Sequence, residues 1–170
     1  MASCLTHLEE YVKNLYIKIG ITKPHQLDFQ KISDALGIQV FYWPDASQAL
    51  FTGSKGFILL NELLSPQLQW QDYCHELGHV LLHVGNQWQM QESFRAYQEE
   101  KANLFMQHAC IPTFMLNELN LYDCGPFQVY EVQQLFNVDY SFAHKRLQQY
   151  INNKRIMPNW NFNLSEAPIY

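Results

Sequence analysis

The stretch "DYCHELGHVLLH", residues 72–83, decides how the rest of the chain is interpreted. It places His75 and His79 four residues apart, with Glu76 directly after the first histidine. On an α-helix, two residues at this spacing lie ~40° apart in azimuth and ~6 Å apart along the axis. Both imidazoles can therefore reach a single metal ion.

Glu76 points to the same side of this helix but is displaced by about a quarter turn from His75. The offset is poor for a third ligand and suitable for contact with a water molecule held by the ion. In the HExxH pattern, zinc lowers the pKa of its water to about 7, and the glutamate takes the proton as that water attacks a carbonyl. The pattern therefore predicts Zn²⁺ as the cofactor, His75 and His79 as ligands, and Glu76 as the catalytic base.

His83, one turn further along, is not expected to join these ligands. It lies ~12 Å from His75 along the helix axis and ~80° around it, which is too far for a shared ion on a continuous helix. A metzincin would need glycine and histidine where this chain has Leu82 and Gly85. We therefore exclude the metzincin class and expect a structural role for His83.

The third ligand is expected from the stretch "QEEKANLF", residues 98–105, because a catalytic zinc normally has three protein ligands and one open position. Glu99 and Asn103 share one face of a second long helix, so the carboxylate can bind metal while the amide oxygen accepts a hydrogen bond from a ligand imidazole. Glu100 and Glu92 are the alternatives. Glu100 lies ~100° away and Glu92 near or before the helix start, so we predict Glu99.

The elements around these two helices predict a mostly helical α+β fold. Apolar residues recur at three- and four-residue steps over residues 5–19, and a shorter helix follows Asp28 and stops at Gly37. Three short β-prone runs separated by turn residues favour a small three-stranded antiparallel sheet. These runs are residues 38–43, 48–53 and 56–61.

Start and stop signals place the motifs on helices. Ser65 as N-cap and Pro66 at the first helical position begin the helix that carries HExxH, and Pro112 ends the next. Two apolar-striped helices then follow around a turn at residues 137–141. We expect one domain over 1–170, with a core over 1–125, a helix pair over 126–155 and an irregular tail over 156–170.

Composition limits the partners. A net charge of −5 argues against direct binding of nucleic acid. The best local candidate for such binding is the basic cluster of Lys145, Arg146, Lys154 and Arg155, which a solvated helix face explains equally well. No segment approaches the ~20 apolar residues of a membrane span, so we expect a cytoplasmic protein that does not bind membranes.

Two segments resemble the ImmA/IrrE family of metallopeptidases, which occur in phages and mobile elements and as stress regulators. They are "HELGHVLLH", residues 75–83, and "EEKANLFMQHACIP", residues 99–112. The likeness extends over roughly residues 25–150 and includes "LFNVDYSFAHKRL", which is similar to a helix-turn-helix-like tail. Met106 and "ACIP" depart from the family pattern at positions that concern packing.

The resemblance implies a zincin-like fold with His75, His79 and Glu99 as zinc ligands and Glu76 as the base. It also implies a zinc-dependent, site-specific endopeptidase of the gluzincin-like HExxH type. Its protein substrate would be a helix-turn-helix transcriptional repressor, whose cleavage relieves repression of a mobile element or a stress response.

The sequence also allows other interpretations of the function and of the site. The chain could instead be a non-proteolytic zinc-containing regulator that binds a repressor or DNA, or it could hold a purely structural metal. The second oxyanion donor could be Tyr97, His83 or His108. An exposed strand, at residues 48–53 or 56–61, is expected to border the cleft and align the substrate by strand addition.

Overall fold

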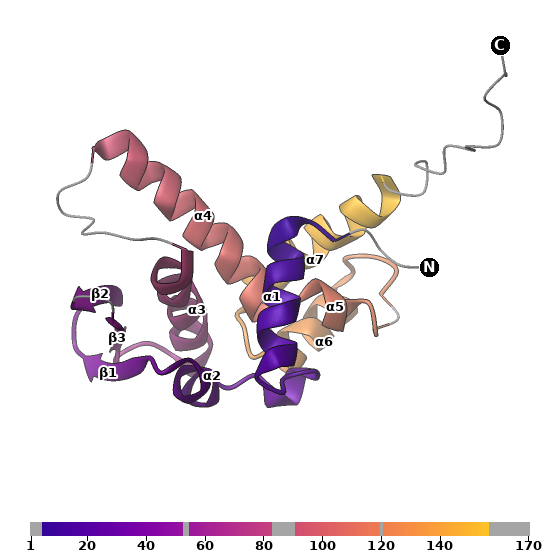
Figure 1. Ribbon diagram of the computed structural model, residues 1–170. Coiled ribbons are helices and arrows are strands. Elements are labelled where there is room, and N and C mark those ends of the chain that lie inside the picture. The colour runs from indigo at the N-terminus through magenta and orange to yellow at the C-terminus, as the bar shows by residue number, and fades with distance from the viewer. Residues whose placement is uncertain (1–4, 53–54, 83–90, 120, 157–170) are drawn as a thin grey trace, which may run out of the picture.

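The computed structural model describes residues 5–52, 55–82, 91–119 and 121–156. Over these residues the chain is mostly helical with one small three-stranded sheet, as the α+β prediction required (Figure 1). The elements are α1 (His7–Lys18), η1 (Pro24–Gln26), α2 (Phe29–Leu36), β1 (Gln39–Trp43), β2 (Gln48–Thr52), β3 (Lys55–Asn61), α3 (Pro66–Leu82), α4 (Glu92–Cys110), α5 (Thr113–Leu116), α6 (Pro126–Phe136) and α7 (Tyr140–Ile156).

Local side-chain contacts explain where the first helices begin and end. Thr6 and Glu9 form a capping box at the start of α1, in which the Glu9 carboxylate accepts the Thr6 backbone N–H at 2.8 Å. The Asp28 carboxylate accepts the Lys31 N–H at the start of α2, and Gly37 ends that helix in the left-handed region at φ 68°. These helix limits agree with the sequence prediction.

The sheet is mixed, so the predicted antiparallel arrangement was wrong. The strand order is β1-β3-β2, with β2 antiparallel and β1 parallel to the central strand β3. β3 is the most buried of the three strands, and its Ile58 and Leu60 side chains are fully buried. A central position buries such a strand on both sides, which periodicity in the individual runs does not reveal.

Helix α3 carries the HExxH motif and packs against both the sheet and α4. Figure 1 shows the sheet and α2 on one side of α3, and α4 crossing its other side. Gly78 allows the two helices to approach closely: a Cβ atom there would lie 3.2 Å from the Ala102 Cα and 3.1 Å from the Phe105 ring. The close approach brings one face of α4 next to the HExxH motif.

Helices α6 and α7 form the C-terminal helix pair expected from the sequence. Asn137 ends α6 with φ 49°, and the Asp139 carboxylate accepts the backbone N–H groups of Ser141 and Phe142 at the start of α7. The predicted tail lies outside the described residues, except for the backbone of Ile156 at the end of α7. In the part of the chain that the structure describes, no helix is long and apolar enough to cross a membrane.

Candidate metal centre

Helix α3 directs two imidazoles to one point. His75 and His79 lie one helical turn apart, and their Nε2 atoms are 3.1 Å from each other. The ring planes are inclined at 70°, with centroids 4.8 Å apart. The His79 side chain is only 3% exposed, whereas His75 is partly open to solvent.

Helix α4 adds the carboxylate of Glu99. Its Oε2 lies 3.3 Å from the His75 Nε2, and its Oε1 lies 3.4 Å from the His79 Nε2. One ligand atom from each of the three residues falls within 4.8 Å of the others. The structure therefore brings together all three residues that the sequence pattern selected as ligands.

The donor set fits zinc. Bonds of about 2.0–2.2 Å to a tetrahedral ion place neighbouring ligand atoms about 3.3–3.6 Å apart. The separations of 3.1, 3.3 and 3.4 Å in this cluster are close to that range. Two imidazole nitrogens and one carboxylate oxygen also match the ligand types of a catalytic zinc site, and three protein ligands leave a fourth position for water or substrate.

Glu76 is buried beside this cluster, with a residue exposure of 8%. Burial raises its pKa to about 8; a hydrogen bond from the Ala49 backbone N–H opposes this, and the negative charges of Glu99 and Asp72 raise the pKa further. Because Ala49 belongs to β2, the carboxylate lies between the cluster and an outer strand of the sheet. A buried carboxyl with a raised pKa can both accept and return a proton near neutral pH.

Several other residues considered from the sequence lie elsewhere. Glu92 and Glu100 are exposed on α4 and do not belong to the three-residue cluster. Asn103 is also exposed, and it lines a groove between α4 and α7. His83 falls outside the described residues.

The two described candidates for a second oxyanion donor contact other parts of the protein. Tyr97 is 52% exposed and stacks on Phe94, with the Lys101 ammonium over its ring. His108 lies two and a half turns beyond Glu99 on α4, where its Nδ1 is 3.2 Å from Arg146. Both side chains thus make contacts with residues outside the cluster.

Arg146 was wrongly assigned to a solvated helix face. It is only 2% exposed and donates to the backbone oxygens of Gln107 and Ile111 and to the Thr113 hydroxyl. The Thr113 hydroxyl in turn donates to the buried carboxylate of Glu9. The helical spacing of Arg146 from Ala143 and Tyr150, which are both buried, was the signal that would have placed it inside.

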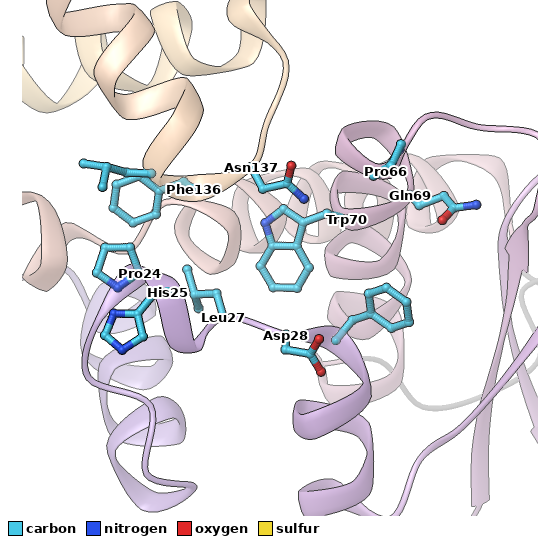
Figure 2. A pocket seen from close by; sticks show the side chains of 11 residues that line it. Pro24, His25, Leu27, Asp28, Pro66, Gln69, Trp70, Phe136 and Asn137 are labelled. Atoms are coloured by element: carbon cyan, nitrogen blue, oxygen red, sulfur yellow. The ribbon is translucent and has the colours of Figure 1, made fainter.

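A cavity of about 240 Å³ at the start of α3 is separate from the metal cluster. Figure 2 shows Trp70 of α3 facing Leu27, Phe136 and Asn137 across this space. None of the residues that line it belongs to the cluster. The chemistry of the HExxH motif is therefore not located in this cavity.

Two histidines and one glutamate around a single point form a donor set of the kind that metallopeptidases use. Residues 33–148 match the family model of the IrrE N-terminal-like domain, a peptidase family, and the chain belongs to that family. This confirms the resemblance drawn from the two motif segments.

Two relatives come from Bacillus subtilis (strain 168). The chain is 43% identical over 154 residues to the phage-like element PBSX protein XkdA, covering 91% of this chain and 78% of that protein. It is 39% identical over 145 residues to the uncharacterized protein YqaB, covering 85% of this chain and 84% of the relative. One relative thus belongs to a phage-like element.

Among solved structures, a Mycobacterium tuberculosis transcriptional regulator has a similar fold. The TM-score is 0.54 at 16% sequence identity, and the match covers 83% of this chain. The chain spans only 55% of that protein, so the likeness concerns the fold of the shared part.

Proposed function

We propose that this protein is a zinc-dependent, site-specific endopeptidase that cleaves a helix-turn-helix transcriptional repressor and so relieves repression of a mobile element or a stress response. The observation that carries the proposal is the convergence of His75, His79 and Glu99 beside the buried carboxyl of Glu76. Membership of a peptidase family and similarity to a phage-like element protein support it.

In this proposal His75, His79 and Glu99 hold Zn²⁺. When bound, the ion supplies a Lewis acid that polarises the scissile carbonyl and acidifies the attacking water. Glu76 accepts the proton of that water and returns it to the leaving amine. The hydrogen bond from Ala49 holds the Glu76 carboxylate in place for both transfers.

Strand β2 is the part of the sheet that would align the substrate. β3 is paired with a strand on each side, so its backbone cannot pair with a substrate. Among the described strands, β2 pairs with β3 alone and has a free edge. The contact between Ala49 and Glu76 places this edge next to the site. An extended substrate added to β2 would therefore pass close to Glu76.

The proposal treats residues 1–170 as a single metallopeptidase domain. Its support is one continuous core that includes Val12 of α1, Ile58 of β3, Leu77 of α3 and Leu147 of α7. The helix pair of α6 and α7 would then be a fixed part of the peptidase.

The test is incubation of the protein with the repressor encoded by a neighbouring gene, with and without a zinc chelator, followed by mass analysis of the fragments. The wild type should cut the repressor at one bond, and the chelator or Glu76→Gln should abolish the cut. Glu100→Gln, which changes an exposed carboxylate on α4 outside the cluster, is the matched control and should cleave normally.

The same variants separate the proposal from its rival. If the Glu76→Gln protein still binds zinc and still induces the repressed genes in cells, the chain acts by binding its partner and peptide hydrolysis is not its function.

A further inference from the structure

A groove of about 330 Å³ lies between α4 and α7. Met106 and Phe142 supply its apolar surface, Asn103 and Gln107 supply amides, and Lys145 supplies a cation. Arg146 completes the lining. The groove thus combines a surface for an apolar side chain with a positive charge at its border.

The groove lies on the same face of α4 as Glu99, further toward the C-terminal end of the helix. Asn103 and Met106 lie within ~40° of Glu99 in azimuth, at ~6 Å and ~10 Å further along the helix axis. An extended peptide advances about 3.3 Å per residue. A substrate whose scissile bond lies at the cluster therefore reaches the groove two to four residues from that bond.

Lys145 is the residue in the groove whose charge is available to a ligand. Its side chain is exposed, and in the described parts of the chain no carboxylate lies within 4.0 Å of its ammonium. The charge of Arg146 is instead directed to backbone oxygens and to Thr113 inside the protein. The unpaired cation is complementary to an aspartate or glutamate.

The two walls of the groove are fixed to each other. Arg146 of α7 donates through Nε to the Gln107 oxygen and to the Ile111 oxygen, both at 3.3 Å. These bonds cross from α7 to the C-terminal end of α4. A groove whose walls are held in this way loses less conformational entropy when a ligand binds than a mobile surface would.

We propose that this groove binds the substrate two to four residues from the scissile bond and selects an apolar side chain accompanied by an aspartate or glutamate. The inference rests on the proposed peptidase function and adds to it the substrate class and the residue that selects it. Lys145 is a specificity-determining residue, whereas Glu76 carries out the proton transfers.

The experiment uses the repressor encoded by the neighbouring gene and a labelled peptide of about twelve residues that spans the bond cut in it. Lys145→Glu should raise KM about five- to tenfold with kcat unchanged, because it converts an attraction between exposed charges into a repulsion. On the Glu76→Gln background, which should bind without cutting, Lys145→Glu should raise the Kd of the peptide by the same factor in fluorescence anisotropy. Lys154→Glu, on the same helix but outside the groove, should change neither value.

A charge swap gives the decisive result. Replacing the acidic residue near the scissile bond with lysine should impair cleavage by the wild type and restore cleavage by Lys145→Glu. If the wild type cuts the repressor but Lys145→Glu has an unchanged KM, or no acidic residue lies within four positions of the bond, the groove assignment is wrong and the peptidase function stands. If the wild type does not cut the repressor, the proposed function fails, and the groove assignment fails with it.

Discussion

Replacing Arg146 with methionine is expected to destabilise the protein severely, although the residue lies on α7 and does not belong to the metal cluster. Arg146 and Glu9 are 2% and 8% exposed, and the Thr113 hydroxyl connects them by accepting from the guanidinium and donating to the carboxylate. His108 lies between the same two charges, 3.8 Å from Glu9 and 3.2 Å from Arg146. The network joins α1, α4, α5 and α7.

The expected loss of stability follows from the charge that Arg146→Met leaves buried. Methionine fills most of the volume but leaves the Glu9 carboxylate buried without a compensating cation. Hydrogen bonds from Thr6 and Thr113 hold the pKa of Glu9 below its ordinary value despite burial, so the group stays charged at neutral pH. Removing one partner of a buried charge pair costs about 3–5 kcal/mol. For a chain of this size, that loss lowers the unfolding temperature by about 10 °C.

The assay is thermal unfolding of the chelator-treated protein at pH 7.5, so that zinc binding does not contribute to the measured stability. The double variant Glu9→Gln with Arg146→Met removes both charges and should recover part of the loss, since no charge is then left buried and unpaired. Glu9→Gln alone should cost less than Arg146→Met, because the amide can still accept from Thr113.

An unfolding temperature of Arg146→Met within 2–3 °C of the wild type would refute the argument that this network stabilises the fold. Strict additivity of the two substitutions would refute the narrower argument that the charges depend on each other.

Three other predictions concern the cluster and its supports. Gly78→Val should force α3 and α4 apart, because its Cβ would meet the Ala102 backbone at 3.2 Å, and should weaken zinc binding at least tenfold in competition with a chromophoric chelator. His79→Ala should abolish zinc binding and cleavage while far-UV circular dichroism retains most of the helical signal; complete unfolding would instead indicate a structural metal. Burial and the charge of Arg146 lower the pKa of His108 to about 4, below its ordinary 6.5, so the unfolded chain binds more protons between these values and stability is lost as pH falls through them. In urea unfolding at pH 7.5 and 4.5, the wild type should lose about 2 kcal/mol more on acidification than His108→Gln, because the raised pKa of Glu76 contributes equally to both proteins.

The sequence was sufficient to predict that the three side chains meet, because the spacing of residues along a helix determines which face of the helix they occupy. His75 and His79 had to share a face once Ser65 and Pro66 began the helix, and Glu99 was the acidic residue of α4 whose face was compatible with a ligand. The roles of these residues in binding zinc and in catalysis remain predictions that the experiments above address.

The sheet and the buried arginine could not be obtained in the same way. Periodicity in "IQVFYW" and "GFILLN" indicates strands but does not say which strand is central or which pairs are parallel. Arg146 was misplaced because charged residues are usually exposed, and only the tertiary partners Thr113 and Glu9 make its burial tolerable. Both errors concern contacts between segments that are distant in the sequence.

The small sheet also has a consequence for how the protein behaves in concentrated solution. β1 and β2 are its two outer strands, and they carry the exposed side chains of Phe41, Tyr42, Leu50 and Phe51. Outer strands with aromatic and aliphatic side chains facing water are templates for intermolecular strand pairing. The same strand that would receive an extended substrate is thus expected to promote aggregation when no substrate is present, and a short peptide that occupies β2 should suppress light scattering during storage.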